Sequence, residues 1–544
     1  MSATPPGPRI LFFLYHAGYL RHYRESIRLL AERGAVVHLS FTKIEKDEGD
    51  TLLAERLAAE FPDRVTFGGS PTRGYFDGWR RTSTLVRAFT DLARYLDPRY
   101  ADAPALRRRM AKKIRLQILS GRSDPITTFV ATRLVDRLSA RTDAKFGRRL
   151  IRLLATAERA IPTSRKIDDY VRSFTPDAVL VTPLVEYASN QVDYLKSAAR
   201  LRVPTAACIA SWDNLTNKGL LRFVPDRVLI WNEIQLGELV ELHGIPADRA
   251  AITGAAKFDS WFELEPTRDA AAHKRHVGLD PGKPYLLYVC SSPFIAPDEV
   301  TFVKRWIAAL RAAGGEVGEL GVLVRPHPQN ARQWQDADLE DANAAIWPRE
   351  GAQPDFAEAK AGFYDSIAHS AAVVGVNTSA MIDAAIVGKN VLTILDSEFA
   401  STQEGTLHFH YLLRENGGFL EVARTLDEHV AQLRHVLEDG SSEEERLRAF
   451  VEHFVRPRGL DRPVAPIIAD EIAVLATLEP RTSRHAGLAA SALRVVLLVP
   501  SAVASFALLV GIAAEKLTLG GAARRREERL ERARSAQRAL DQAR

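Results

Sequence analysis

Two short polar segments in the second half of the chain carry residues that commonly bind phosphate. The first, Arg325-Pro326-His327-Pro328, follows a run of apolar residues. A guanidinium group and an imidazole can both donate hydrogen bonds to phosphate oxygens, and the guanidinium can donate two at once. The alternative is a turn stiffened by proline, in which the histidine caps the next helix. We favour the phosphate-binding role for Arg325 and His327.

The second segment, Gly375-Val376-Asn377-Thr378-Ser379, joins a predicted strand to a predicted helix. Asn377 or Thr378 is expected to cap that helix, whose first backbone N–H groups attract anions. The hydroxyls of Thr378 and Ser379 add two donors, and Asp383, one helical turn further on, could accept hydrogen bonds from ribose hydroxyls. Many helices begin in this way, so the prediction of an anion site at this segment depends mainly on the presence of Arg325 and His327.

A third polar segment, residues 402–409, follows the predicted strand at residues 391–395 and contains Glu404, Gly405 and Thr406. An amide, an acid and an imidazole beside a glycine suit the recognition of sugar hydroxyls. A surface loop that happens to hold a histidine is the alternative. The position of the segment after a strand favours the binding role.

The first half offers candidates for a general base, the group that removes a proton from a reacting hydroxyl. In the polar run at residues 211–219, Asp213 could be this base and Trp212 could stack on a sugar or shape the site. His16, in the loop after the first predicted strand, is the rival base. Glu186 is a third and weaker candidate for the base, and Asn214 and Lys257 are also expected to line the cleft.

Apolar runs precede most of these segments and predict the strands that position them. Residues 10–15 and 285–290 are short, continuously apolar runs, typical of strands buried on both faces of a parallel sheet. Strand and helix patterns alternate in both halves, which predicts an α/β fold of two doubly wound, Rossmann-like sheets. Ligands of such sheets bind beyond the carboxyl ends of the strands, so the polar segments should face one cleft.

The chain of 544 residues is too long for a single core, and the pattern divides it into parts. We predict one Rossmann-like domain at residues 1–264, a linker at 265–283 and a second domain at 284–478. Residues 79–166 form a predicted helical insertion with 22 Lys and Arg against 7 Asp and Glu. This insertion is either a set of solvated helix faces or a basic surface for anionic lipid or a phosphate-bearing ligand.

Residues 479–544 are expected to form a hydrophobic, membrane-associating segment and a charged tail. Residues 495–514 carry no charge, a length that could span a bilayer or lie in its surface. The first eight residues lack the apolar stretch of a signal peptide. The two cysteines, Cys208 and Cys290, lie in apolar runs and are interpreted as buried, inert thiols. No metal-ligand spacing is visible, so no metal is predicted.

The segments at 325–328, 365–367, 377–379, 383–385 and 388–393 together resemble the C-terminal half of GT-B glycosyltransferases. Within them the chain is most similar to the branch of CDP-glycerol glycerophosphotransferases and capsule or lipopolysaccharide transferases. The resemblance covers residues 170–470 and implies that His327, Thr378 and Ser379 bind the donor pyrophosphate. It also implies that His16 deprotonates the acceptor hydroxyl. The glycerophosphotransferases usually carry an Asp-Tyr-Ser-Ser run at the position of residues 376–379, and this departure favours a nucleotide sugar over CDP-glycerol.

The resemblance therefore implies a metal-independent glycosyltransferase with a GT-B fold, an acceptor domain first and a donor-binding domain second. The expected donor is a nucleotide sugar, with no other cofactor, and the expected acceptor is a lipid-linked or cell-envelope saccharide. An anionic membrane surface is a further expected partner, nucleic acid is not, and the expected location is the cytoplasm at the inner face of the membrane. Alternatives are a CDP-polyol phosphotransferase, a UDP-sugar 2-epimerase, or a non-catalytic scaffold or sugar sensor on the same fold.

Overall fold

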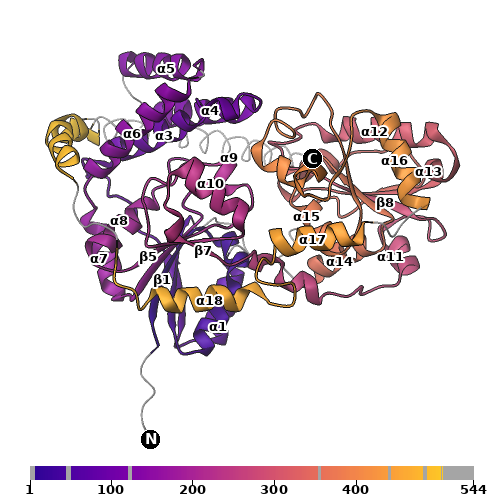
Figure 1. Ribbon diagram of the computed structural model, residues 1–544, viewed down its shortest axis with the longest axis horizontal. Helices are drawn as coiled ribbons and strands as arrows, with labels where there is room; N and C mark the ends of the chain where they lie inside the picture. Colours follow the sequence, from indigo (N-terminus) through magenta and orange to yellow (C-terminus); the bar gives the residue numbers. More distant parts are fainter. Residues whose placement is uncertain are drawn as a thin grey trace, which may run out of the picture.

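The structure is a computed structural model that describes residues 7–43, 51–120, 125–141, 143–352, 357–438, 443–481, 487–503 and 505–506. It contains two parallel β-sheets, which lie side by side in Figure 1. The first sheet comprises β1 (Arg9–His16), β2 (Val36–Lys43), β3 (Val65–Gly69), β4 (Ala178–Thr182), β5 (Thr205–Cys208), β6 (Arg227–Ile230) and β7 (Ala250–Ile252). The second comprises β8 (Tyr285–Val289), β9 (Gly321–Arg325), β10 (Ala344–Ile346), β11 (Ala372–Gly375), β12 (Val391–Ile394) and β13 (Glu421–Ala423).

Both sheets have the strand order of a Rossmann domain. The first runs β3-β2-β1-β4-β5-β6-β7 and the second β10-β9-β8-β11-β12-β13, with every named pair parallel. In each sheet the order reverses beside the first strand, between β1 and β4 and between β8 and β11. The predicted α/β fold of two doubly wound sheets is therefore confirmed.

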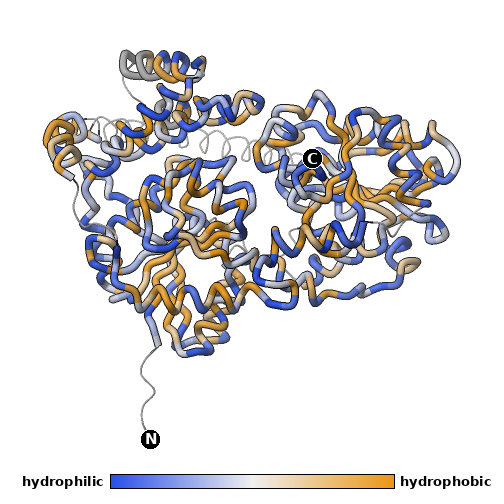
Figure 2. The backbone as a smooth tube through the Cα atoms, viewed as in Figure 1, coloured by the Kyte–Doolittle hydropathy of each residue, from blue (hydrophilic) through white to orange (hydrophobic). Residues whose placement is uncertain are grey.

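Helices cover the sheets, and the strands are apolar because they are buried on both faces. In β1, residues 10–14 are all buried, and Figure 2 shows the sheet interiors as the most hydrophobic parts of the chain. The helices of the first half, apart from the insertion, are α1 (Arg24–Glu32), α2 (Leu52–Glu60), α7 (Arg165–Phe174), α8 (Val192–Arg200), α9 (Asn214–Asn217) and α10 (Glu233–His243). Those of the second half are α11 (Ala270–Val277), α12 (Glu299–Ala313), α13 (Gly315–Glu319), α14 (Ala357–Ala368), α15 (Ala380–Ile386), α16 (Leu426–Glu438), α17 (Glu444–Phe454) and α18 (Val464–Leu475).

Short 3₁₀ helices make many of the connections. They are η1 (Ala17–His22), η2 (Pro98–Tyr100), η3 (Ala247–Arg249), η4 (Ala256–Glu263), η5 (Pro328–Trp334), η6 (Leu407–Leu412) and η7 (Arg414–Asn416). Of these, η1 follows β1 and η5 follows β9, so both lie beyond the carboxyl end of a strand.

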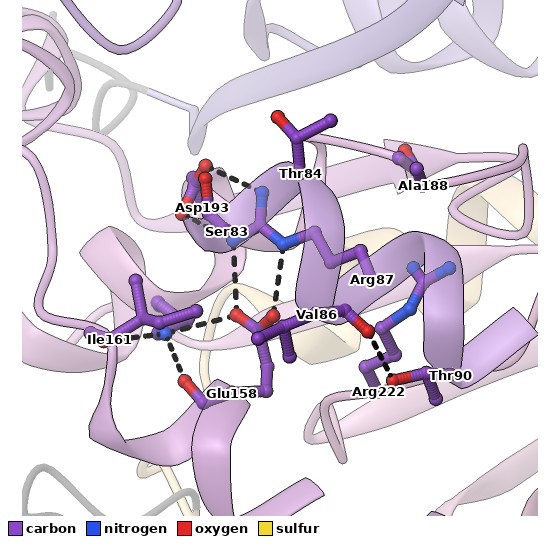
Figure 3. Close-up of polar contacts among 12 residues, drawn as sticks. Ser83, Thr84, Val86, Arg87, Thr90, Glu158, Ile161, Ala188, Asp193 and Arg222 are labelled. Atoms are coloured by element: carbon purple, nitrogen blue, oxygen red, sulfur yellow. Dashed lines mark hydrogen bonds and ion pairs between the residues drawn. The ribbon is translucent and has the colours of Figure 1, made fainter. Parts of the chain in front are cut away.

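The predicted insertion is helical and contains α3 (Arg80–Arg94), α4 (Pro104–Ser120), α5 (Pro125–Ser139) and α6 (Ala144–Ala160). Part of its positive charge points inward. Arg87 on α3 donates hydrogen bonds to Glu158 on α6 and to Asp193 on α8, as Figure 3 shows. Only part of the basic surface predicted from composition is therefore exposed, because buried carboxylates neutralise some of these arginines.

The chain returns to the first domain near its end. The range predicted for the second domain extends to residue 478, but α18 packs against the core of the first sheet through residues such as Ile468 and Ile472. Asp259 in η4 fixes the start of α18 by accepting hydrogen bonds from the backbone N–H groups of Val464 and Ala465. Within the predicted linker, α11 packs against α14 of the second half.

A helix at residues 488–503 lies beside α6 in Figure 1 and is held there by a hydrogen bond from Arg494 to the carbonyl of Ala160. No helix in the described part of the chain is long and apolar enough to cross a membrane. Residue 504 and residues 507–544 lie outside the described residues, so most of the predicted tail and the second half of the 495–514 segment do too.

Candidate functional site

A cavity of about 250 Å³ lies between the two domains. One wall is formed by the ends of β8 and β9 and by the turn after β11, which is the point where the strand order of the second sheet reverses. The opposite wall comes from η1, α1 and η4 of the first half. Two Rossmann-like domains that face each other across a cavity form the predicted GT-B arrangement. The cavity also occupies the position where open α/β sheets bind their ligands.

Arg325, the last residue of β9, lines the cavity and is only 6% exposed. Its guanidinium lies over the rings of Phe363, at 4.5 Å, and Trp347, at 5.2 Å. Its Nη1 atom has no hydrogen-bond partner among the described residues, and burial lowers the pKa of the group to about 9. A buried cation without an anion is costly, and an anionic ligand would remove that cost.

His327 is held by the turn that follows β9. Its Nδ1 accepts a hydrogen bond from the backbone N–H of Gln329 at 3.1 Å, so the histidine caps η5. Burial lowers its pKa to about 4, which keeps the imidazole neutral at pH 7. A neutral ring that accepts at Nδ1 carries its proton on Nε2. His327 therefore caps η5, as the alternative interpretation of this turn expected, and it also lines the cavity with one N–H left to donate to a ligand.

Thr378 and Ser379 line the cavity in the turn between β11 and α15. Both are half-buried, and Ser379 occupies the N-cap position of α15 without a side-chain cap bond. The hydroxyl of Thr378 accepts a hydrogen bond from the backbone N–H of Ala380, the first residue of α15, at 3.4 Å, so Thr378 takes part in capping this helix as expected. Asn377 does not line the cavity. Its side-chain amide donates to the carbonyl of Thr402 at 2.9 Å and so ties the turn to the next loop.

Asp383 and Lys257 line the cavity from different domains. Burial raises the pKa of Asp383 to about 7, although Lys257 and Lys360 partly offset this effect. Burial also lowers the pKa of Lys257, against the opposing influence of Asp383 and Asp213. The two groups are too far apart for an ion pair but close enough to influence each other's titration.

Sequence reasoning missed several residues that line the cavity. Arg21 and His22 come from η1, directly after β1, and Lys360 comes from α14, where its amine donates to the Ser260 hydroxyl at 2.8 Å. Burial and then the charges of Lys257 and Arg21 lower the pKa of His22 well below its usual value. The place of η1 after the first strand was the available signal, because the loop beyond a strand's carboxyl end faces the ligand.

The predicted general bases lie in a second polar cluster next to the cavity. Glu186 accepts hydrogen bonds from Tyr19 and Lys218, each at 3.0 Å. Burial raises the pKa of Glu186, but Lys218, Tyr19 and Lys113 together outweigh burial, so the net pKa is lowered. Burial also raises the pKa of Asp213, but Lys218, His408, Ser211 and Arg109 together outweigh burial, so the net pKa is lowered too. The ring of His16 packs 4.4 Å from that of Tyr19.

Other predicted residues lie in the contact between the two domains and do not line the cavity. Trp212 is buried against His408 and Phe454, with ring centroids 4.8 and 6.4 Å away. Asn214 braces its own loop by accepting hydrogen bonds from the backbone N–H groups of Ala210 and Ser211.

The segment after β12 lies in the same contact. Gly405 approaches the insertion so closely that an added Cβ would lie 2.0 Å from the carbonyl oxygen of Asp102. Thr406 is buried and donates to the carbonyl of Gln403, while Glu404 pairs with Arg424 at 3.5 Å. Gly405 therefore lies against the insertion, Glu404 and Thr406 make their contacts within the second half of the chain, and none of the three lines the cavity.

Both cysteines are buried, as predicted, and Cys290 lies at the edge of the cavity. Burial, followed by the charge of Glu299, raises the pKa of Cys290 well above its usual value, and burial also raises the pKa of Cys208. Thiols in this state are poor nucleophiles. Over the described residues, no group of three His, Cys, Asp or Glu side chains could hold a metal ion.

No protein-family model and no curated protein matches this sequence. Among solved structures, the chain is similar to the UDP-GlcNAc 2-epimerase of Methanocaldococcus jannaschii, with 11% identity and a TM-score of 0.47 over 85% of this chain and 99% of that one. The Neisseria meningitidis UDP-GlcNAc 2-epimerase bound to UDP-GlcNAc has 11% identity and a TM-score of 0.46, over 85% of this chain and 99% of that one. The calicheamicin glycosyltransferase CalG4 has 12% identity and a TM-score of 0.42, over 86% of this chain and 98% of that one. All three scores are below 0.5, so the fold assignment rests on the two strand orders themselves.

Proposed function

We propose that the protein is an enzyme that binds a nucleoside-diphosphate sugar in the cavity between its two domains. The observation that carries the proposal is the buried guanidinium of Arg325 at the switch point of the second sheet, whose Nη1 atom has no partner among the described residues. His327, Thr378 and Ser379 add neutral donors around the same space. Together they offer a diphosphate one cation and three further hydrogen bonds, and Asp383 lines the same cavity.

The first candidate reaction is transfer of the sugar to a hydroxyl of an acceptor. Arg325 and Lys257 would stabilise the negative charge that develops on the leaving diphosphate. The acceptor hydroxyl would approach from the polar cluster beside the cavity, where His16 or Asp213 would take its proton. Asp213 is ionised at neutral pH because its pKa is lowered, so it can accept a proton or hold the acceptor in place.

A second candidate reaction is epimerisation of the sugar at C2, which needs acid–base groups in the cavity and no acceptor. Asp383 favours this candidate because its pKa of about 7 lets it accept and return a proton near neutral pH. Glu25 and the neutral His22 line the same space and could act as its partners. The similarity in fold to UDP-GlcNAc 2-epimerases makes UDP-GlcNAc the first substrate to test.

A thermal-shift screen with UDP, GDP, CDP, CMP and dTDP tests the binding proposal. A ligand that binds only the folded protein must raise its melting temperature. One nucleotide should stabilise the wild type and not His327→Ala. His435→Ala, an exposed histidine on α16, serves as the matched control and should behave as the wild type. Stabilisation by none of the nucleotides, or an equal shift in all three proteins, would rule out this donor site.

Incubation with the sugar nucleotide in deuterated water separates the two reactions. An epimerase produces the second sugar nucleotide without an acceptor, and a proton exchange at C2 introduces deuterium there. A glycosyltransferase leaves the sugar nucleotide unchanged until an acceptor is supplied and then releases the nucleoside diphosphate. His16→Ala and Asp213→Asn should each be assayed, because only the base of the transfer reaction should be needed for turnover and not for nucleotide binding.

For the transfer reaction we propose a lipid-linked or cell-envelope saccharide as the acceptor, at the inner face of a membrane. The support is the exposed apolar surface of the helix at residues 488–503, next to the basic insertion. Pelleting of the full chain with anionic vesicles, compared with neutral ones, tests the membrane part of this proposal. Equal recovery in the supernatant with both vesicle types would count against it.

A further inference from the structure

A second and larger cavity, of about 1120 Å³, lies between the insertion and the body of the first domain. Its walls come from α3, α6 and α8, from the loop at residues 220–224, and from the end of α10. Arg494 of the C-terminal helix also lines it. None of its lining residues lines the cavity between the domains, so the two are separate sites.

The lining of this cavity carries an excess of positive charge. Ten Lys and Arg residues line it, against four acidic residues: Asp97, Glu158, Asp168 and Glu241. All four acids already have cationic partners. Asp97 and Glu241 pair with Arg99, Glu158 with Arg87 and Lys196, and Asp168 with Arg200. The acids of the lining therefore do not neutralise the remaining cations.

Three of the uncompensated cations share one helix. Arg148, Arg152 and Arg159 all line the cavity from α6, and none has an ion pair with any described residue. A cavity with several such guanidinium groups suits a phosphate, which guanidinium groups bind in a bidentate fashion.

Apolar side chains line the same cavity. On α6, Ile151 lies three residues after Arg148, so these two side chains share a helix face. Across the cavity, Leu220, Leu221 and Ile245 are buried, Phe223 is half-buried, and Val224 is 38% exposed. A site for a small inorganic anion would not need this hydrocarbon surface. The combination fits a ligand with a charged end and an apolar end.

The helix that contributes Arg494 extends the apolar surface. The Nε atom of Arg494 donates a hydrogen bond to the carbonyl of Ala160 at the end of α6, at 2.7 Å, and this contact places the helix at the cavity. Val495, Val496, Leu498, Val499 and Val503 on this helix are each more than half exposed, and Figure 2 shows the helix as a hydrophobic surface element. Contiguous exposed aliphatic residues are typical of a surface that meets lipid or another apolar partner.

We propose that this cavity binds the phosphate end of an anionic amphiphile, with the phosphate on the arginines of α6 and the hydrocarbon chain against Ile151, Phe223 and Val224. A membrane phospholipid and a lipid-linked phosphate share this chemistry. The site is separate from the cavity of the proposed function, so either proposal can fail without the other.

Titration calorimetry of the full chain with dodecyl phosphate, below its micelle concentration, tests the proposal. Butyl phosphate and inorganic phosphate test whether the ligand needs a long alkyl chain. Dodecyltrimethylammonium tests whether the ligand needs a negative charge. Each buried CH₂ should strengthen binding roughly fourfold. Dodecyl phosphate should therefore bind at least tenfold more tightly than butyl phosphate, and the cationic detergent should not bind.

Paired variants locate the site. Arg148→Gln with Arg152→Gln should weaken dodecyl phosphate binding at least tenfold. Arg108→Gln with Arg137→Gln, two exposed arginines of α4 and α5 that do not line the cavity, removes the same charge and should leave the affinity unchanged. Circular dichroism confirms that both double variants are folded, and the nucleotide thermal shift should be the same in both.

Two results would overturn the proposal. Equal affinities for butyl and dodecyl phosphate would identify a site for a soluble phosphate, without a role for the apolar wall. Equal affinities of the two double variants for dodecyl phosphate would show that the detergent binds elsewhere. If the proposal holds, vesicles containing phosphatidic acid and a soluble polyprenyl phosphate analogue can then be competed against dodecyl phosphate to separate the two natural sources.

Discussion

Two buried arginines of this protein have opposite surroundings. Arg87, in the insertion, donates four hydrogen bonds of 2.8 to 3.0 Å to Glu158 and Asp193. Burial lowers its pKa, but the two carboxylates outweigh burial and the net pKa is raised. Arg325, in the cavity between the domains, lies on two aromatic rings without a carboxylate, and burial lowers its pKa. A compensated arginine holds a fold together, whereas the surroundings of Arg325 support the proposal that its cavity binds an anion.

Breaking the compensated group should have the largest effect on stability. Arg87→Leu leaves the carboxylates of Glu158 and Asp193 buried with fewer partners, so we expect the free energy of unfolding to fall by about 3–5 kcal/mol. Urea denaturation measures this loss. Arg108→Leu, which removes an exposed arginine of the same insertion, should change stability by about 0.5 kcal/mol or less. A loss below about 1 kcal/mol in Arg87→Leu would mean that Lys196, already 3.1 Å from Glu158, takes over the compensation.

Replacing Arg325 should weaken nucleotide binding without lowering stability, the reverse of the effect expected at Arg87. Arg325→Met keeps an apolar side chain against Phe363 and Trp347 and removes a buried, unpaired cation, so stability should stay the same or rise. Nucleotide binding should weaken by about 1.5–3 kcal/mol, roughly 10- to 100-fold, because hydrogen bonds to a charged group are lost. Calorimetric titration with the nucleotide found in the thermal-shift screen measures the change. Unchanged affinity together with lost stability would give Arg325 the same structural role as Arg87.

Of the residues predicted to line the cavity, those that follow strands of the second sheet do so more often than those that follow strands of the first sheet. Arg325, His327, Thr378, Ser379 and Asp383 gather in one cavity because the carboxyl ends of parallel strands share an edge, which a strand pattern reveals. Lys257 joins them from the first half.

The remaining site predictions depended on contacts between distant parts of the chain. Trp212 and Gly405 also follow strands, yet they pack in the contact between domains, and no local pattern says which loop faces the other domain. Arg87 finds its partners 71 and 106 residues away, so composition alone could not show that it points inward. The alternation of strands and helices was local information, whereas the pairing of the charges was not.

Asp383 offers the smallest and most specific test, because it lies in the same cavity as Arg325 but titrates near neutral pH. Burial raises its pKa to about 7, above its value in an unfolded chain. The folded protein therefore binds this proton more tightly, and the stabilisation present below about pH 4 is lost as the pH rises through 7. An ionised Asp383 would also repel the diphosphate, so nucleotide affinity should fall, by up to about tenfold, between pH 6 and pH 8.

Asp383→Asn stays neutral and should remove this part of the pH dependence. The nucleotide's own titration is common to both proteins, so the difference between their affinity profiles isolates Asp383. Parallel profiles would show that the ligand does not sense this carboxyl group. An affinity that rises with pH in the wild type alone would show instead that the ionised carboxylate accepts the ribose hydroxyls, because hydrogen bonds to a charged acceptor are the stronger ones. The direction of the difference therefore decides which part of the nucleotide lies at Asp383, and with it the orientation of the sugar relative to His16 and Asp213.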